Sequence, residues 1–317
     1  MPGGCKVTGV QNVTVDQASD GQRIDNYLIK ILKKVPKSRI YRMLRSGEVR
    51  VDGKRIQPLF RVVVGQTVRI PPVIAAPVDS EAVRPPSQLI ESLQRRILYQ
   101  DSDLLVLDKP AGIAVHAGSG VSLGAIEVLK SVTDGFLELV HRLDRDTSGV
   151  LLLARSPRVL KSLQASFRER LVTKIYRAVV HGHLAVNSLE ISSPLQRYLS
   201  ASGERRVRVD AETGRQAVTT VTTLVAGDVV STVQVGIGTG RTHQIRVHLA
   251  ELGHPVVGDE KYGEKERGPT RLAGRLLLHA EIIQFDLEDR PHQYVARVPD
   301  VFFSVQNQSP LSPVGEH

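Results

Sequence analysis

The segment HRLDRDTSG, residues 141–149, runs directly into the apolar stretch Val150 to Ala154. It places two carboxylates, Asp144 and Asp146, among two arginines and a histidine. A short apolar run that follows turn residues predicts a buried strand, so the charged segment lies where a strand begins. Segments next to strands often carry functional side chains. Two interpretations are therefore open: one carboxylate does chemistry, or the segment is a salt-bridged turn.

The length and composition limit the class of protein. A chain of 317 residues has room for one large domain with a small satellite, because single cores stop growing at about 250–300 residues. No stretch approaches the roughly 18 consecutive apolar residues of a membrane span, and the N-terminus does not resemble an export signal. We expect a cytoplasmic protein without a membrane segment. A lone Cys5 can form neither an internal disulfide nor a multi-cysteine metal site, so it receives no role.

The net charge of +9 is concentrated in one part of the chain. Between Gly21 and Ile70, thirteen Lys and Arg stand against three Asp and Glu, whereas the remainder is close to neutral at −1. A concentrated basic stretch is the expected footprint of an element that binds a polyanion.

The basic stretch has the pattern of two short helices and a hairpin. Apolar residues recur at helical spacing from Ile24 to Ile31, and a second apolar stripe follows in SRIYRMLRSG. Ser38 is the predicted N-cap of the second helix and Gly47 its stop. Asp52 and Gly53 are a hairpin turn signal between two short strands.

This stretch, residues 21–70, resembles an S4 domain, a small RNA-binding module. The alternative is a charged face that only solvates a small domain, but the charges are nearly all of one sign. We therefore expect RNA contacts from the residues on the polar faces of these elements: Lys37, Arg39, Arg42, Arg45, Arg50, Lys54 and Arg55.

The rest of the chain divides into a linker, a large domain and a tail. Residues 71–90 contain five of the seventeen prolines and predict a semi-rigid linker. Residues 91–301 alternate strand-like and helical segments and predict one mixed α/β domain. Residues 1–20 are taken as an N-terminal extension, and 302–317 as a disordered tail. The predicted strands are 97–99, 104–107, 148–153, 174–181, 218–225 and 229–235, and the predicted helices are 122–132, 157–168 and 242–252.

Two further motifs of the large domain join polar groups to turn residues: DKPAGIAVH, residues 108–116, and GRTHQIRVHL, residues 240–249. Each has an ordinary structural explanation as well, a turn in the first case and the polar face of a helix in the second. GIGTG, residues 236–240, lacks the Gly spacing and the lysine of nucleotide-binding loops. His243 and His248 are five residues apart, outside the spacing of a helical zinc pair. The sequence therefore indicates neither a bound nucleotide nor a metal site, and leaves a carboxylate enzyme attached to an RNA-binding module.

The three motifs together resemble the RluA family of pseudouridine synthases, and HRLDRDTSG is the most specific of them. With the S4-like module and the string AVHAGSG, the chain is most similar to members that modify large-subunit (23S) ribosomal RNA. The resemblance covers about Gly21 to Val301. It implies an α+β fold, with a mixed, mainly antiparallel β-sheet flanked by helices and the site in a central cleft.

The resemblance also implies roles for individual residues. Asp144 corresponds to the catalytic aspartate, and Asp146 is left with a structural role. Arg142 corresponds to the arginine that enters the RNA where the target base leaves its stack. Tyr176 matches the tyrosine that packs on that base and takes part in proton transfer at C5, and Arg241 matches the arginine that pairs with the catalytic carboxylate.

Two more substrate contacts are expected. Leu278, in LLLHA, corresponds to a residue that lines the pocket. His116 is expected near the substrate, although a single histidine is more often structural.

The implied reaction is the isomerisation of uridine to pseudouridine. Asp144 either attacks C1′ or removes the C2′ proton, and the sequence leaves both routes open. The reaction needs no metal, nucleotide or other cofactor, and we expect a monomer. The alternatives are a non-catalytic RNA-binding or ribosome-assembly protein, and a glycosidase that releases the base.

Overall fold

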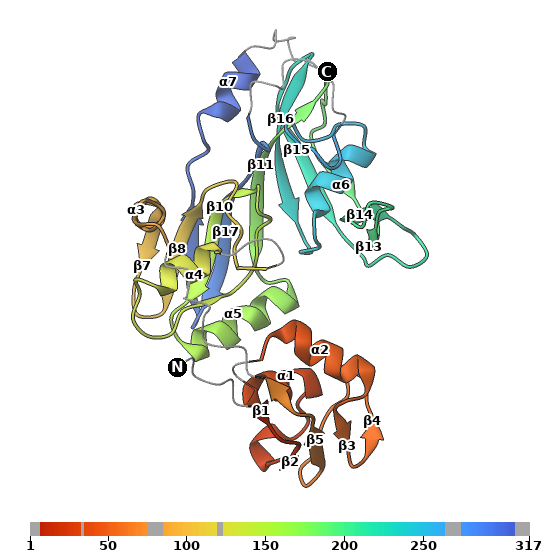
Figure 1. Ribbon diagram of the computed structural model, residues 1–317. Coiled ribbons are helices and arrows are strands. Elements are labelled where there is room, and N and C mark those ends of the chain that lie inside the picture. Colours follow the sequence, from red (N-terminus) through yellow and green to blue (C-terminus); the bar gives the residue numbers. More distant parts are fainter. Residues whose placement is uncertain (1–6, 33–34, 75–84, 119–122, 264–273, 308–317) are drawn as a thin grey trace. The chain divides into compact units, whose positions relative to one another are not determined.

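The computed structural model describes residues 7–32, 35–74, 85–118, 123–263 and 274–307 (Figure 1). The chain divides into two compact units, Met1–Arg84 and Pro85–His317. Of the predicted linker, residues 75–84 lie outside the described part. Its two ends are ordered elements, because Val73–Ile74 forms strand β6 and Ser87–Gln94 forms helix α3.

The smaller unit has the predicted pair of helices, α1 (Ile24–Ile31) and α2 (Lys37–Ser46). Ile24 and Leu28 of α1 and Ile40, Met43 and Leu44 of α2 are among the buried residues of its core. The predicted cap of α2 is wrong: the cap position is Pro36, and the helix already includes residue 38. The predicted stop is Gly47, which adopts the left-handed conformation that favours glycine after a helix.

A four-stranded sheet completes the smaller unit, in the order β2-β5-β3-β4. The hairpin of β3 (Arg50–Val51) and β4 (Lys54–Arg55) turns at Asp52 and Gly53, which both have positive φ, as a two-residue hairpin turn requires. β2 (Gln11–Thr14) pairs with β5 (Thr67–Ile70), and β1 (Val7–Thr8) pairs with β6. Residues 7–14, which the sequence assigned to an extension, therefore belong to sheets of this unit.

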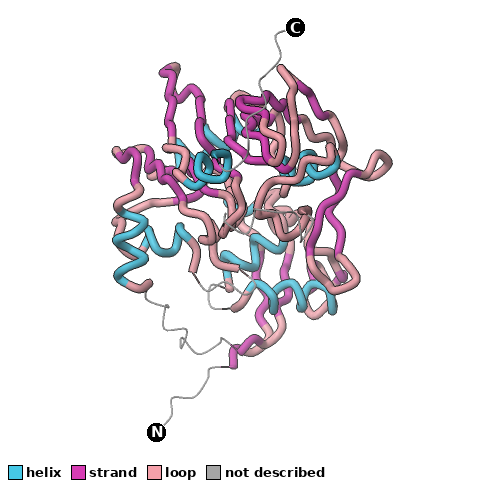
Figure 2. The backbone as a smooth tube through the Cα atoms, turned by 90° about the horizontal axis from the view of Figure 1, so that it is seen from above, coloured by secondary structure: helices cyan, strands magenta, loops and turns pink. Residues whose placement is uncertain are grey.

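The larger unit is built on a ten-stranded sheet with the main order β12-β15-β16-β11-β17-β10-β8-β7. Figure 1 labels most of these strands, and Figure 2 shows the backbone from above with the strands in magenta. Every pairing in this sheet is antiparallel except that of β10 with β17. The expected mixed, mainly antiparallel fold is thus confirmed. The strands of this sheet are β7 (Ile97–Gln100), β8 (Leu104–Lys109), β9 (Glu138–Leu139), β10 (Ser148–Ala154), β11 (Thr173–His181), β12 (Leu189–Ile191), β15 (Thr219–Ala226), β16 (Val230–Ile237), β17 (Leu278–Leu287) and β18 (Arg290–Val295).

Helices pack on both faces of this sheet. Leu151 and Leu153 of β10 share a core with α3, α4 (Ala125–Lys130) and α6 (Gln244–Glu251). Val150 and Leu152 pack in another core with α5 (Pro157–Glu169). Because both faces of β10 are covered, the strand is a continuous apolar run rather than an alternating one.

Several elements of the larger unit were not predicted, among them α3, β9, β12 and β18. β13 (Leu195–Leu199) and β14 (Arg205–Val209) form a separate hairpin, whose Leu195 and Val207 pack with Val247 of α6. The C-terminal helix α7 (Val301–Asn307) buries Phe302, so the predicted disorder is wrong for residues 302–307. None of the helices in the described ranges is long and apolar enough to cross a membrane.

The start of β10 depends on Gly149. There β10 runs beside β17, with Gly149 opposite Ala280. A Cβ at Gly149 would lie 2.1 Å from the Ala280 carbonyl oxygen, and its φ of 111° is unfavourable for other residues. The glycine of DTSG therefore permits the close strand contact that fixes the end of the preceding loop.

Candidate active site

The loop of residues 141–147 joins β9 to β10, and a buried lysine fixes its position. Lys109 Nζ donates hydrogen bonds to the carbonyl oxygens of Pro110 (2.8 Å), Ile113 (2.8 Å) and Arg145 (3.0 Å). The side chain is fully buried, and burial lowers the pKa of Lys109 to about 7. In its protonated form, Lys109 uses all three of its donors in these contacts. Lys109 thus ties the DKPAG turn to the HRLDRDTSG loop.

The other end of the loop is held by a buried polar network. The Ser148 hydroxyl lies 2.8 Å from His279 Nδ1 and accepts a hydrogen bond of 2.6 Å from Arg275. His279 Nε2 lies 3.2 Å from the Ala296 carbonyl oxygen. Burial lowers the pKa of His279 to about 4, so its ring is neutral at pH 7. A neutral ring uses one nitrogen as donor and one as acceptor, which suits these two contacts.

The loop borders a pocket of about 80 Å³, formed with β11, the start of β17, and the segment from the end of β16 into α6. Since one water needs about 10–15 Å³ on this measure, the pocket has room for a small planar ring. Most of the expected site residues of this unit meet here: Arg142, Asp144, Tyr176, Arg241 and Leu278 all line the pocket.

Asp144 is partly exposed in this pocket, with 31% of its side chain accessible. The nearest ionisable partner among the ion pairs of the described residues is His243, whose Nε2 lies 3.9 Å from Asp144 Oδ2. Thr147 N–H donates to the Asp144 carbonyl at 3.2 Å, which closes the turn behind the carboxylate. Asp144 is one of the residues that line the pocket.

Tyr176 lies on β11 and is buried, with 9% of the residue accessible. Burial, together with the negative charge of Asp144, raises the pKa of Tyr176 above its ordinary value of 10. Its hydroxyl therefore keeps its proton at neutral pH. Leu278 is also buried and supplies an apolar part of the wall.

A buried cation, Arg246, lies in the pocket wall, and it was not among the predicted site residues. Its guanidinium makes a two-point ion pair with the Asp259 carboxylate, with N–O distances of 2.7 and 2.6 Å. The central carbon of the guanidinium also lies over the Tyr262 ring, 5.2 Å from the ring centroid. Burial opposes the charge of Arg246, yet its pKa is raised, because the Asp259 hydrogen bonds and the charges of Asp259 and Asp144 act in the opposite direction. Arg246 therefore stays cationic beside Asp144.

Arg241, the expected partner of Asp144, lines the same pocket but makes a different contact. It is exposed, and its Nε donates to the Gln216 carbonyl at 3.1 Å. The available sequence signal for Arg246 was its place on α6 between the apolar Ile245 and Val247, which the motif assignment did not use. A buried arginine needs a carboxylate, and Asp259 supplies it thirteen residues later.

His116 and Arg142 differ in their relation to the pocket. His116 is half-buried and is not among the residues that line it. Arg142 is exposed at the rim, where a side chain can reach a bound macromolecule. No group of three or more His, Cys, Asp or Glu among the described residues is arranged to hold a metal ion.

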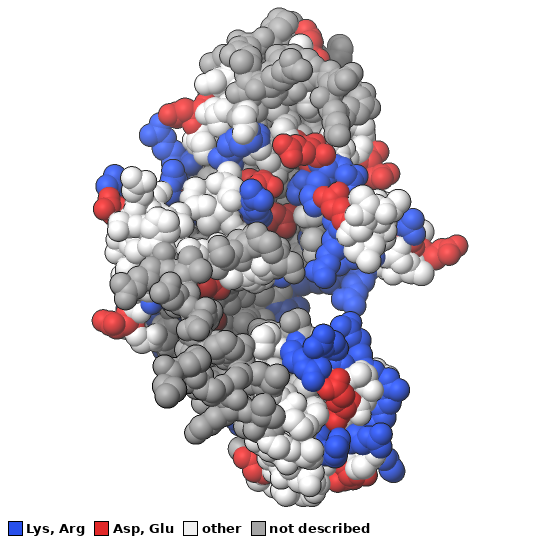
Figure 3. Space-filling model, viewed as in Figure 1, with Lys and Arg blue, Asp and Glu red and all other residues white. Residues whose placement is uncertain are grey.

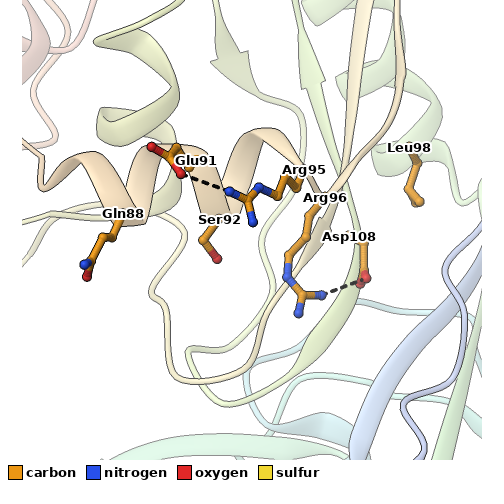
Figure 4. A pocket seen from close by; sticks show the side chains of 7 residues that line it. All are labelled: Gln88, Glu91, Ser92, Arg95, Arg96, Leu98 and Asp108. Atoms are coloured by element: carbon orange, nitrogen blue, oxygen red, sulfur yellow. Dashed lines mark hydrogen bonds and ion pairs between the residues drawn. The ribbon is translucent and has the colours of Figure 1, made fainter.

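A wider surface hollow of about 700 Å³ lies between α3 and the start of β7 (Figure 4). Its arginines are paired with its own carboxylates, Arg95 with Glu91 at 3.0 Å and Arg96 with Asp108 at 3.2 Å. Burial raises the pKa of Asp108 although Arg96 lies beside it. None of the predicted site residues lines this hollow.

On the smaller unit, Lys and Arg side chains gather on one face (Figure 3). Arg42, Arg45, Arg50, Lys54 and Arg55 are exposed. Two further residues of the predicted set differ from these.

Arg39 is partly buried and forms an ion pair with Glu48 at 2.7 Å, so it is less available than the others. The side chain of Lys37 lies outside the described part of the structure.

Comparisons with known proteins agree with this division. Residues 103–251 match the family RNA pseudouridylate synthase, and residues 22–68 match the S4 domain. The chain is 47% identical over 280 residues to ribosomal large subunit pseudouridine synthase C of Escherichia coli (strain K12), covering 86% of this chain and 87% of that protein. It is 44% identical over 282 residues to the protein of the same name from Pasteurella multocida, covering 87% and 86%.

Solved structures are similar to the larger part of the chain. Human RNA pseudouridylate synthase domain containing 1 aligns with a TM-score of 0.60 and 28% identity, over 72% of this chain and 92% of that one. Human RNA pseudouridylate synthase domain containing 4 aligns with a TM-score of 0.58 and 26% identity, over 71% of this chain and 98% of that one.

Proposed function

Because the chain belongs to the RNA pseudouridylate synthase family, we propose that it isomerises specific uridines to pseudouridine in large-subunit ribosomal RNA, with Asp144 as the catalytic carboxylate. The observation that carries the proposal is the pocket in which Asp144, Tyr176 and Arg246 meet from separate parts of the chain. The identity of the relatives supports the choice of RNA, since their name specifies the large ribosomal subunit.

The carboxylate has the chemistry that the first step needs. An ionised aspartate can act as a nucleophile or as a base, and a cationic neighbour favours its charged form. Arg246 is that neighbour, held by Asp259 within the wall of the pocket.

The reaction changes connectivity without a net change in composition. Asp144 promotes cleavage of the bond between N1 and C1′, either by attack at C1′ or by removal of the C2′ proton. The uracil then turns within the pocket and C5 bonds to C1′; in the first route the Asp144 carboxylate leaves C1′, and in the second Asp144 returns the proton to C2′. The proton on C5 then leaves, and N1 gains a proton. No oxidant, reductant or water enters the balance, so the proposal includes no cofactor.

The pocket wall suits a flat base. Leu278 and the ring of Tyr176 are buried and can pack against a uracil. Because the Tyr176 hydroxyl keeps its proton at neutral pH, a role in removing the C5 proton requires that it pass its own proton on, and Asp144, whose charge acts on Tyr176, is the proposed acceptor. Enclosure of the base also limits the loss of uracil or the entry of water.

The RNA contacts are assigned to two places. A base that reacts must leave its stack, at a cost of about a few kcal/mol, and the exposed Arg142 at the pocket rim is proposed to fill the gap. The S4 domain, with its exposed arginines and Lys54, is proposed to bind phosphates, since Lys and Arg supply most contacts of that kind. We further propose that the protein acts as a monomer in the cytoplasm.

The experiment that tests the proposal uses protein-free large-subunit ribosomal RNA and the purified protein, without ATP, added metal or reductant. Pseudouridine is mapped by carbodiimide labelling and primer extension, and free uracil is measured in parallel. We expect labelled positions that require the protein, and no free uracil. Release of uracil would indicate a glycosidase, and bound but unchanged RNA would indicate a non-catalytic binding protein.

A further inference from the structure

His243 is held in an unusual conformation beside the proposed catalytic carboxylate. It lies immediately before α6 with φ 53°, in the left-handed region that few residues other than glycine adopt. Residues in sparsely populated backbone conformations are often found at functional sites. Its side chain is 14% accessible, and its Nε2 faces Asp144 Oδ2 at 3.9 Å.

The backbone around His243 is fixed by the next residue. Gln244 is buried and uses both ends of its amide. Its oxygen accepts from the Thr239 hydroxyl (2.7 Å) and from Arg241 N–H (3.1 Å). Its nitrogen donates to the Val218 carbonyl and the Thr219 hydroxyl, at 2.8 and 2.9 Å. These four hydrogen bonds stabilise the turn that presents His243.

The ring of His243 is oriented by Tyr262. The Tyr262 hydroxyl accepts a hydrogen bond from Val207 N–H at 3.0 Å and lies 2.6 Å from His243 Nδ1. Burial raises the pKa of Tyr262 to about 12, so the hydroxyl keeps its hydrogen. When the Tyr262 hydroxyl donates this hydrogen to His243 Nδ1, Nδ1 is the acceptor, and the hydrogen of the neutral ring is carried by Nε2. The N–H group of the ring then points to Asp144.

Burial of His243 favours a neutral ring at pH 7. Burial lowers the pKa of His243 below 6.5; Asp144 and Asp259 act against this shift, whereas Arg246 and Lys261 add to it. A neutral imidazole can donate a hydrogen bond to a carboxylate without forming an ion pair, and so without cancelling its charge. A contraction of less than 1 Å would bring the 3.9 Å separation into hydrogen-bonding range, and such contacts often tighten only when substrate binds.

We propose that His243 is a positioning residue: oriented by Tyr262, it donates its Nε2–H to Asp144 and holds the carboxylate toward the reacting sugar. This inference rests on the proposed function. Val207 N–H orients the Tyr262 hydroxyl, and this hydroxyl orients the His243 ring toward Asp144.

The test is single-turnover pseudouridine formation with the full-length protein and an RNA that the wild type modifies. His243→Asn keeps a residue that tolerates left-handed backbone but is too short to reach Asp144. His243→Gln can place an amide N–H near the position of Nε2. Tyr262→Phe keeps the ring and removes the hydroxyl that orients His243.

We expect His243→Asn to slow the reaction about 10- to 100-fold, less than the 10²–10³ for loss of a donor that acts on the transition state itself. RNA affinity and thermal midpoint should remain near those of the wild type. His243→Gln should recover at least tenfold of the lost rate, and Tyr262→Phe should give an intermediate rate.

The pH profile separates positioning from a structural role. In the wild type, the rate should fall as the pH drops through the pKa of His243, below 6.5, because imidazolium would pair with Asp144 and reduce its reactivity. His243→Gln should lack this fall, since an amide does not titrate there. A rate for His243→Asn within twofold of the wild type would overturn the inference. So would equal losses in both His243 variants with an unchanged pH profile. A wild type that forms no pseudouridine would instead refute the proposed function.

Discussion

The buried pair of Arg246 and Asp259 offers a perturbation whose size follows from the structure. In Asp259→Asn, the side-chain oxygen can keep the hydrogen bonds from Lys261 N–H (2.9 Å) and Tyr262 N–H (3.1 Å). The amide nitrogen then replaces the oxygen that faces Arg246 Nε at 2.7 Å, so two donors oppose each other. The variant changes few atoms but leaves a buried cation without its counter-charge.

Breaking a buried ion pair in this way costs about 3–5 kcal/mol of the free energy of unfolding. For a unit of about 150–250 residues, each kcal/mol shifts the thermal midpoint by about 2–4 °C. We therefore expect the midpoint of the larger unit to fall by roughly 6–20 °C.

The pH of the measurement follows from the pKa of Asp259. Burial alone would raise that pKa, but the hydrogen bonds and charge of Arg246 dominate and lower it below 3.8. A carboxyl group whose pKa is lower in the folded state than in the unfolded state stabilises the fold at every pH above its unfolded-state pKa. This stabilisation is lost as the pH falls through the folded-state pKa. At pH 7 the whole effect is present, and below pH 3.8 the difference between wild type and variant should shrink.

Thermal melting and pseudouridine formation, the latter measured well below both midpoints, provide the assay. The matched control is the double variant Arg246→Met with Asp259→Leu, which removes both charges. Replacing a buried pair by apolar residues is often neutral or stabilising, so most of the stability should return. Activity should not return, because the cation beside Asp144 is gone. A midpoint for Asp259→Asn within 2 °C of the wild type would show that the charge of Asp259 is not needed to stabilise the buried Arg246.

Three further predictions concern the loop, the pocket and the S4 domain. Gly149→Ala should destabilise the larger unit by about 2–6 kcal/mol in urea denaturation, from steric overlap and positive φ together, whereas Gly118→Ala, with open space around it, should change little. Tyr176→Phe should lower the rate about 100-fold if the hydroxyl handles a proton while RNA affinity stays the same; an unchanged rate would limit Tyr176 to packing. Changing Arg42, Arg45 and Lys54 together to Gln should reduce the slope of log affinity against log salt by about 1 per lost phosphate contact, and an unchanged slope would exclude these residues from the RNA surface.

Much of the fold follows from local sequence patterns. The continuous apolar run after DTSG predicts a strand that is covered on both faces, and β10 is such a strand. The Asp52-Gly53 turn fixes a hairpin by its own backbone preference. Local sequence patterns did not predict the elements that depend on contacts with residues far along the chain. β2 is a short strand that pairs with β5, and Phe302 packs in a core with residues distant in sequence.

The pocket was predicted less completely than the fold. Motif positions led to Asp144, Tyr176 and Leu278, which do line one pocket. The charged neighbours depend on which face of α6 each residue occupies and on partners far along the chain. Arg246 is defined by Asp259, and His243 by Tyr262, so neither could be assigned from the motif alone.

The central claim is that Asp144 carries out an isomerisation, and its most direct test follows the hydrogen on C5. Ribosomal RNA labelled with tritium at C5 of uridine is incubated with the wild type and with Asp144→Asn. We expect the wild type to release tritium in step with pseudouridine and without free uracil. Asp144→Asn should release none while it binds the RNA as tightly. Tritium release by the variant at the wild-type rate would exclude Asp144 as the catalytic carboxylate.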